Sequence, residues 1–130
     1  MTKVTSGPGS VRTFKRRAKY NNRHTHADGL HFDSKKEEAR YHQLKAMVES
    51  GDINSMEVHP RFYFFLQGRP LVIRSTGYPG GRRVYYEADF AYRQGDGLVV
   101  EDVKGMDSDV SRLKRALVEL FHGVEVKVVK

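Results

Sequence analysis

The sequence predicts an α/β fold in which helices flank a mixed central sheet. Two segments, 34–50 and 107–121, place apolar residues at helical spacing between capping residues and a following glycine. Several segments between and after them alternate apolar and polar residues, as strands do. The order is therefore helix, antiparallel strands, helix, strand. The last strand can pair in parallel with the sheet because the second helix provides the crossover.

A chain of 130 residues is expected to form one domain with a modest core. It contains no cysteine, which excludes a disulfide framework and a cysteine-based zinc site. No apolar run approaches the length of a membrane span, and the N-terminal segment lacks the hydrophobic stretch of a signal peptide. These features indicate a soluble intracellular protein without a membrane partner.

The net charge of +7 is concentrated in the N-terminal segment. Residues 1–27 contain seven basic residues and no acidic residue, whereas the rest of the chain carries 16 of each sign. Such a segment suits a phosphate backbone, and the alternative is a solubilising tail without a partner. We expect a flexible basic arm over 1–18, a domain over 19–130, and DNA contacts from the basic residues Arg12, Lys15, Arg16, Arg17, Lys19 and Arg23.

The first helix should begin after Ser34 as its N-cap and end at about Ser50, where Gly51 stops it. Glu37 lies on the apolar stripe of this helix, and an acid in that position needs a partner. Two interpretations stay open: Glu37 completes a capping box with Ser34, or it contributes to a functional site. The apolar residues of the stripe are Tyr41, Leu44, Met47 and Val48.

The middle of the chain is rich in aromatic residues and glycine. We expect an aromatic strand over 58–66, a short partner strand over 71–74 and an exposed loop over 75–83. His59, at the start of the aromatic strand, either approaches a substrate or fills the strand edge. Further candidates for phosphate contacts are Arg82, Arg83 and Lys114, and for each of them the alternative is a solvated charge.

A hairpin over 84–104 carries the residues with the clearest chemical pattern. If Gly95-Asp96 forms the turn, Asp89 lies opposite Asp102, and if Asp96-Gly97 forms it, Asp89 lies opposite Lys104. In both registers the three charged side chains share one face of the sheet, because strand side chains alternate with a period of two. Glu87 is expected to flank Asp89 on that face, while Tyr86, Phe90 and Tyr92 face the other way.

Two carboxylates directly opposite each other should repel, and a divalent cation between them would turn this repulsion into a binding site. Asp89, Asp102 and Lys104 therefore predict a metal-dependent nuclease centre. The alternative is a strand pair with ordinary surface charges. A β-bulge would replace Asp102 by Glu101 as the ligand.

The segment Asp107–Asp109 offers N-caps for the second helix, which should end at about Phe121, before Gly123. The apolar positions that follow helical spacing in it are Val110, Leu113, Leu117, Leu120 and Phe121. A final strand over 124–129 would place Val124, Val126 and Val128 on one face.

Taken in order, the motifs of this chain resemble a phage-associated family of the PD-(D/E)xK nuclease superfamily, catalogued as a domain of unknown function. That family is similar in core layout to bacteriophage endonuclease I-type junction resolvases. The resemblance covers about residues 19–130. Its motifs are Lys19-Tyr20-Asn21-Asn22, Asp28-Gly29, Phe32-Asp33-Ser34-Lys35-Lys36-Glu37, Pro60-Arg61-Phe62, Ala88-Asp89-Phe90 and Val99-Val100-Glu101-Asp102-Val103-Lys104-Gly105.

The resemblance implies a restriction-endonuclease-like core with a helix acid, a strand acid and an acid-x-Lys motif as its catalytic set. Carried over by position, these residues are Glu37, Asp89, Asp102 and Lys104. The family usually has alanine directly after the helix acid, so an alignment on Ala39 would assign Glu38 instead, whereas the apolar stripe favours Glu37. The expected metal is Mg²⁺ or Mn²⁺, held by Asp89, Asp102 and the carbonyl of Val103.

The expected function is therefore Mg²⁺-dependent hydrolysis of DNA phosphodiester bonds, selective for branched DNA such as a four-way junction. The expected partners are DNA and a second copy of the chain, since symmetric cutting of a junction needs two active sites. A phage-encoded protein of this kind would act in the cytoplasm of the host cell. Two alternatives stay open: a non-catalytic nucleic-acid-binding module, and a nuclease subunit that is active only within a larger complex.

Overall fold

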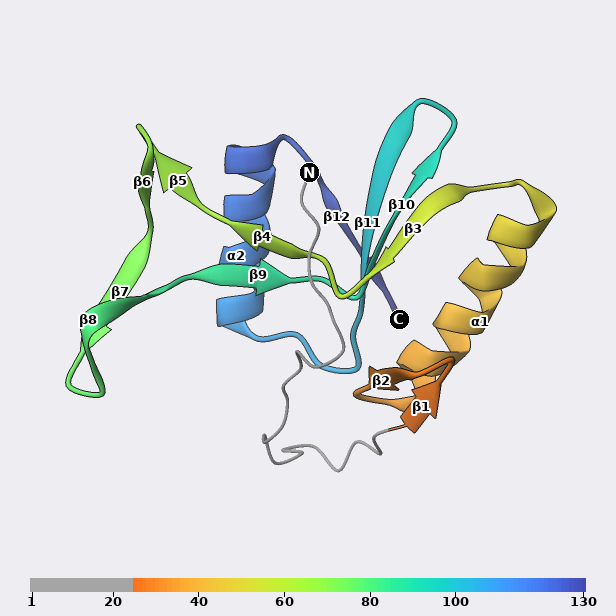
Figure 1. The fold of residues 1–130 in the computed structure, drawn as a ribbon, viewed down its shortest axis with the longest axis horizontal. Helices are drawn as coiled ribbons and strands as arrows, with labels where there is room; N and C mark the ends of the chain where they lie inside the picture. Colours follow the sequence, from red (N-terminus) through yellow and green to blue (C-terminus); the bar gives the residue numbers. More distant parts are fainter. Residues whose placement is uncertain (1–24) are drawn as a thin grey trace.

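The computed structural model describes residues 25–130, which form a mixed α/β fold built on a four-stranded sheet (Figure 1). The strand order is β12-β11-β10-β3. Strands β3, β10 and β11 are antiparallel neighbours, and β12 pairs in parallel with β11. The predicted mixed sheet is thus confirmed. Its strands are β3 (Asn54–Val58), β10 (Phe90–Gln94), β11 (Gly97–Val103) and β12 (Val126–Val129).

The predicted basic arm over 1–18 lies outside the described residues, and so do the six proposed DNA-binding residues between Arg12 and Arg23. Within residues 25–130, neither helix is long and apolar enough to span a membrane.

Both helices have the predicted boundaries, because capping chemistry is local. Helix α1 (Lys35–Ser50) begins where the Ser34 hydroxyl oxygen accepts a hydrogen bond from the amide of Glu37 at 3.1 Å. Helix α2 (Asp109–His122) begins with the equivalent bond from Ser111 to Ser108. Each helix ends at a glycine in the left-handed conformation, Gly51 or Gly123.

The two helices cover opposite faces of the sheet (Figure 1). The short hairpin of β1 (Thr25–Ala27) and β2 (Leu30–Phe32) lies beside the start of α1. On the α1 face the buried core consists of Phe32, Tyr41, Leu44, Ile53, Phe90 and Tyr92. On the α2 face it consists of Phe64, Tyr86, Ala88, Ala91, Val100, Val118 and Val126.

The apolar positions predicted for α2 are only partly covered by the sheet. Val118 is the residue of this helix that is fully buried against the sheet, with Leu117 partly buried beside it. Leu113 and Leu120 instead keep 60% and 77% of their surface exposed, and Val110 and Phe121 are also exposed. Helix α2 contacts β9 and β12. Helical spacing alone could not show which of its apolar side chains these strands would cover.

The two long strands predicted at 58–66 and 84–93 are each broken where they leave the sheet. The first becomes β3, β4 (Arg61–Tyr63) and β5 (Phe65–Leu66), with the break at His59-Pro60. The second becomes β9 (Tyr85–Glu87) and β10, with a bend at Asp89. The breaks lie side by side, because the amide of His59 donates to the carbonyl of Asp89 at 2.9 Å.

This bend also changes which face the neighbouring side chains occupy. Tyr86 packs in the α2 core, whereas Phe90 and Tyr92 pack in the α1 core, so the predicted common face of the three is wrong. Glu87 does not flank Asp89 either: it is exposed and pairs with Arg61 at 3.1 Å. Strict alternation fails here because β9 pairs with β4, while β10 pairs with β3 and β11.

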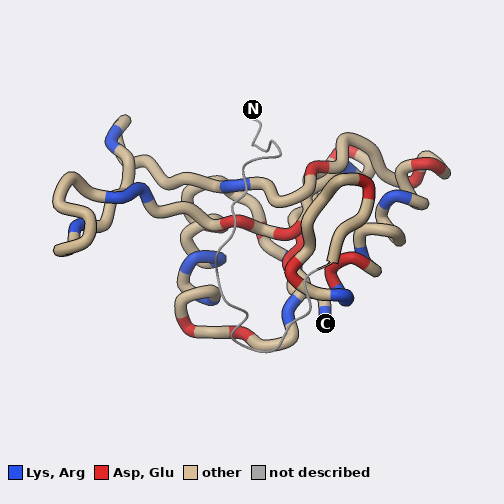
Figure 2. The backbone as a smooth tube through the Cα atoms, turned by 60° about the horizontal axis from the view of Figure 1, so that its bottom comes forward, with Lys and Arg blue, Asp and Glu red and all other residues tan. Residues whose placement is uncertain are grey.

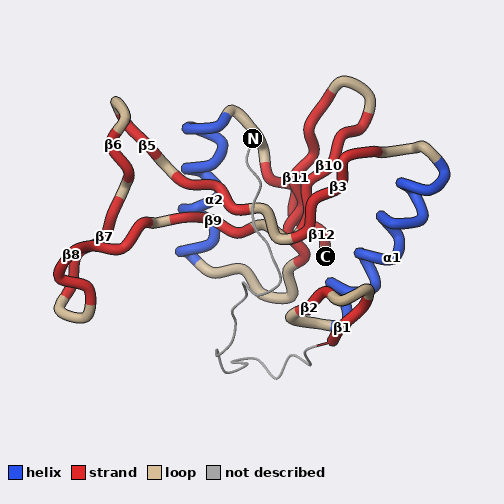
Figure 3. Tube along the Cα trace, in the orientation of Figure 1, coloured by secondary structure: helices blue, strands red, loops and turns tan. Residues whose placement is uncertain are grey.

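The expected loop over 75–83 is instead part of a projecting ribbon. β7 (Val72–Ser75) and β8 (Tyr78–Arg83) form an antiparallel hairpin, and β5 pairs with β6 (Arg69–Pro70). Together with the β4–β9 pair, these strands extend away from the sheet and beyond α2 (Figures 1 and 3). Glycine and exposed polar residues are typical of loops, but backbone pairing between neighbouring segments forms strands here regardless of side-chain burial.

Candidate metal centre

The hairpin between β10 and β11 decides how the predicted site residues meet. Gln94 pairs with Gly97, which makes Gly95-Asp96 the turn, and Phe90 pairs with Glu101. The same register continued by one residue places Asp89 opposite Asp102. The carboxylate Oδ2 of Asp89 accepts a hydrogen bond from the amide of Val103 at 2.6 Å, and Lys104 Nζ lies 3.4 Å from Asp102 Oδ2. Asp89, Asp102 and Lys104 are therefore close together, as expected for the first of the two registers.

Glu101 is not part of this group. It is fully buried on the α1 face, where Arg40 of α1 donates to both of its carboxylate oxygens at 2.8 and 2.7 Å and the hydroxyl of Tyr92 also donates to it. Burial alone would raise the pKa of Glu101, but these hydrogen bonds outweigh it and lower that pKa. The register between β10 and β11 has no bulge, so Asp102 is the acid that faces Lys104.

Glu37 of α1 contacts both the segment before its own helix and a histidine of the candidate site. Only 3% of its surface is exposed. Its Oε1 accepts a hydrogen bond from the amide of Asp33 at 3.1 Å, one residue before the position that a capping box would use. Its Oε2 lies 2.7 Å from Nε2 of His59. Glu38 lies on the polar side of the helix, 3.4 Å from His42. Of the two candidate helix acids, Glu37 is therefore the one that lies beside His59 and Asp89.

The sequence left His59 between a substrate contact and a strand-edge role, and did not predict it as a metal ligand. One carboxylate oxygen each from Glu37 and Asp89 and one ring nitrogen of His59 all lie within 4.8 Å of one another. His59 occupies the left-handed region with φ 59°, an uncommon conformation for a residue other than glycine. The sequence signal that could have found it is its place directly before Pro60, which marks a break in the strand. That the break lies beside Asp89 is known only from the structure.

The electrostatics of this cluster suit a divalent cation. Burial and then the negative charges of Glu37 and Asp102 raise the pKa of Asp89 well above its ordinary value. Burial would lower the pKa of His59, but its hydrogen bond with Glu37 and the charge of that carboxylate outweigh burial and raise it. Figure 2 shows acidic segments gathered where the start of α1 approaches the sheet. The carboxylates of Glu37 and Asp89 and the imidazole of His59, with Asp102 beside Asp89, form a donor set that fits Mg²⁺ or Mn²⁺.

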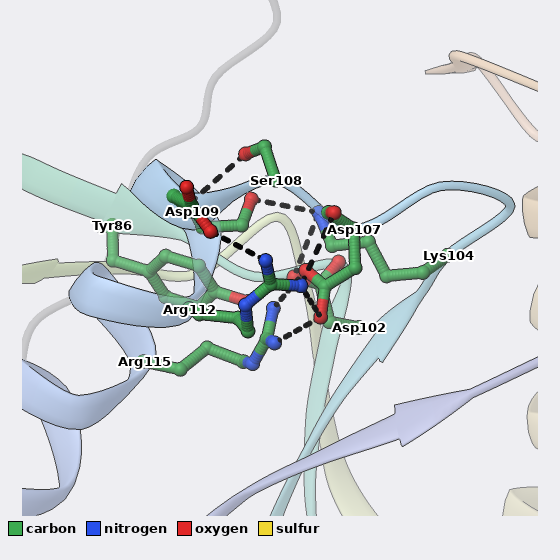
Figure 4. A network of polar contacts seen from close by, with 9 residues as sticks. Tyr86, Asp102, Lys104, Asp107, Ser108, Asp109, Arg112 and Arg115 are labelled. Carbon is green, nitrogen blue, oxygen red and sulfur yellow. Dashed lines mark hydrogen bonds and ion pairs between the residues drawn. The ribbon is translucent and has the colours of Figure 1, made fainter.

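Asp102 and Lys104 are held by residues of β9 and α2 (Figure 4). The hydroxyl of Tyr86 donates a hydrogen bond to Asp102. Lys104 Nζ donates to the hydroxyl of Ser111 in the first turn of α2 at 3.3 Å. The segment before α2 is anchored by Asp107, whose two carboxylate oxygens accept hydrogen bonds from Arg115 at 3.0 and 2.6 Å. The ammonium group of Lys104 thus contacts both Asp102 and Ser111.

The predicted phosphate-binding residues of the described chain lie away from the acidic cluster. Arg82 and Arg83 belong to β8 of the projecting ribbon, where their guanidinium groups lie over the rings of Tyr78 and Phe65 at 4.8 and 5.8 Å. Burial and then the charge of Arg82 lower the pKa of Lys114 on α2. The ribbon and α2 therefore share a basic surface, in agreement with the basic segments seen in Figure 2.

Val103, predicted to offer its carbonyl to the metal, lies between Asp102 and Lys104 in β11. Its amide is engaged with Asp89, and its side chain packs against the α1 core.

The fold and the site define a mixed α/β protein in which a carboxylate–histidine cluster lies next to an aspartate–lysine pair. The protein family described as "protein of unknown function (DUF1064)" matches residues 17–129, and the chain belongs to this family. No significant match is found among curated proteins or among solved structures.

Proposed function

We propose that the protein is a metal-dependent endodeoxyribonuclease of the PD-(D/E)xK type. The observation that carries the proposal is the convergence of Asp89, Asp102 and Lys104 at the end of the β10–β11 hairpin opposite its turn. Glu37 of α1 lies beside Asp89. The order α1, β3, β10, β11, α2, β12 supports the finer assignment to a restriction-endonuclease-like core.

In this proposal Asp89 and Asp102 hold Mg²⁺ or Mn²⁺, and Glu37 and the carbonyl of Val103 complete the ligand set. The bound ion would stabilise charge on the phosphate and lower the pKa of a water molecule. Lys104 is positioned by Asp102 and Ser111 to orient the attacking water or to donate a hydrogen bond to a phosphate oxygen. Tyr86 keeps the Asp102 carboxylate in place.

The proposed substrate is branched DNA, and the proposed setting is phage DNA processing in the host cytoplasm, as the family resemblance implies. The neighbouring cations Arg82 and Lys114, together with Arg83 on the same ribbon, suit contacts to a DNA backbone beyond the scissile phosphate. The basic residues of segment 1–24 would add further contacts. Such contacts position DNA without reading its sequence, which suits selection by DNA shape.

A panel of labelled duplex, nicked, flap and four-way DNAs tests this function. We expect cleavage with Mg²⁺ or Mn²⁺, none with EDTA, and a preference for the branched substrates. Lys104→Met should reduce the rate by about 10²–10⁴-fold, the usual contribution of a positioned proton donor or acceptor. Lys127→Met on β12 is the matched control, because Lys127 is exposed on the neighbouring strand. DNA binding that ignores the metal, without cleavage, would favour the alternative of a binding module.

The exposed apolar side chains of α2 support the proposal of a homodimer. Val110, Leu113 and Leu120 are each at least 60% exposed on one helix, which favours burial against another chain. Light scattering should give twice the chain mass of 14.9 kDa. The variant Leu113→Asp/Leu120→Asp should be monomeric, whereas Leu66→Asp on the ribbon, where Leu66 is 67% exposed, should remain a dimer. A monomeric unaltered protein would contradict the homodimer.

A further inference from the structure

His59 is held in an unusual conformation that aims its imidazole at the acidic cluster. Its backbone is left-handed, its amide donates to the carbonyl of Asp89 at 2.9 Å, and the following residue, Pro60, is buried. A left-handed residue other than glycine costs about 1–3 kcal/mol and persists where the surrounding structure requires it. In this conformation Nε2 of His59 lies 2.7 Å from Oε2 of Glu37.

We infer that His59 is a metal ligand and that, with Glu37 and Asp89, it makes the site prefer Mn²⁺ to Mg²⁺. The inference deepens the proposed function and rests on the same metal centre. Its chemical basis is that imidazole nitrogen suits transition-metal ions, whereas Mg²⁺ is bound by oxygen ligands and keeps several of its waters. Sites made only of carboxylates, carbonyls and water lack this source of selectivity.

The spacing of the donor atoms supports coordination to one ion. The Glu37 and His59 donors are 2.7 Å apart, close to the separation of about 3 Å between neighbouring ligands of an octahedral ion at 2.1 Å. The largest separation in the cluster, up to 4.8 Å, needs to shrink only slightly to match ligands on opposite sides of such an ion, about 4.2 Å apart. On binding, the hydrogen bond between Glu37 and His59 would be replaced by two metal–ligand bonds. The proton on Nε2 of His59 would be released to solvent, which leaves a neutral imidazole with its proton on Nδ1.

The test measures metal binding by the full-length protein without DNA. Calorimetric titration should show Mn²⁺ binding at least ten-fold more tightly than Mg²⁺, and pulsed electron paramagnetic resonance of bound Mn²⁺ should show coupling to a directly coordinated ¹⁴N nucleus. His59→Asn should remove the nitrogen coupling and most of the Mn²⁺ preference while keeping Mg²⁺ binding. Asparagine is chosen because it tolerates the left-handed conformation, so the variant should fold.

His42→Gln is the matched control, because His42 is exposed on α1 and contacts Glu38 rather than the cluster. It should retain both the nitrogen coupling and the metal preference. Absence of nitrogen coupling in the unaltered protein, or an unchanged Mn²⁺ preference in His59→Asn, would overturn the inference.

The outcomes also separate this inference from the proposed function. Mn²⁺ binding with nitrogen coupling but without DNA cleavage would overturn the nuclease and leave the ligand assignment standing. Cleavage with Mg²⁺ without nitrogen coupling would support the nuclease and overturn His59 as a metal ligand.

Discussion

Asp89→Asn is expected to abolish DNA cleavage while leaving the metal-free fold at least as stable as that of the unaltered chain. The substitution removes the carboxylate that lies between the Glu37–His59 pair and Asp102. Cleavage should therefore fall by about 10³-fold or more, corresponding to several kcal/mol of transition-state stabilisation. The asparagine oxygen can still accept the hydrogen bond from the Val103 amide, and its NH₂ group can donate to Asp102. Relief of repulsion should raise the free energy of unfolding by about 1 kcal/mol.

The same variant should alter how stability depends on pH. Because the pKa of Asp89 is raised in the folded state, the folded chain holds this proton more tightly than the unfolded chain does. Without metal, the stability that Asp89 contributes is therefore full below its ordinary pKa of 3.8 and is lost as pH rises through the folded value. The raised pKa of His59 likewise gives stability that is lost as pH rises above 6.5. Asp89→Asn should remove the part of the pH dependence that comes from Asp89 and keep the part that comes from His59.

Urea unfolding in EDTA, measured from pH 4 to pH 8, together with cleavage assays in Mg²⁺ and Mn²⁺, would check both expectations. Asp96→Asn in the exposed hairpin turn is the matched control and should change neither quantity. An Asp89→Asn protein that cuts DNA normally would remove Asp89 from the mechanism, and one that is strongly destabilised would show that its charge supports the fold.

Arg40→Met is expected to have the largest effect on stability, a loss of about 3–5 kcal/mol, because it leaves the carboxylate of Glu101 buried without its counter-charge. Arg40 donates two hydrogen bonds to Glu101 and thereby connects α1 to β11 at the centre of the sheet. Chemical denaturation of the variant would measure the loss. The exposed pair Arg112–Asp109 supplies the control: Arg112→Met should cost less than about 1 kcal/mol, as surface ion pairs usually do.

A multiple variant separates the charge from the packing. Arg40→Met/Glu101→Leu/Tyr92→Phe removes the ion pair and the hydroxyl that would be left unpaired, and it should recover most of the lost stability. Equal stability of Arg40→Met and the unaltered chain would mean that Glu101 takes up a proton or finds another partner.

Elements that depend on neighbouring residues were predictable from the sequence. The caps of both helices, from Ser34 to Gly51 and from Ser108 to Gly123, and the tight turn at Gly95-Asp96 all depend on hydrogen bonds or φ angles within a few residues. The closeness of Asp89 to Asp102 and Lys104 was expected with either of the two possible turns, because both keep the three side chains on one face; the structure selects the Gly95-Asp96 turn.

Features that depend on distant partners were decided by the tertiary structure. The strand breaks at His59 and Asp89 arise because β4 and β9 pair with each other away from the sheet, and this places Tyr86 in the α2 core and His59 against Glu37. Similarly, the burial of Val118 instead of Leu113 depends on which strands α2 meets. Local periodicity shows that a segment is amphipathic, but only packing against residues far along the chain selects the side chains that are covered and brings a histidine and three carboxylates to one place.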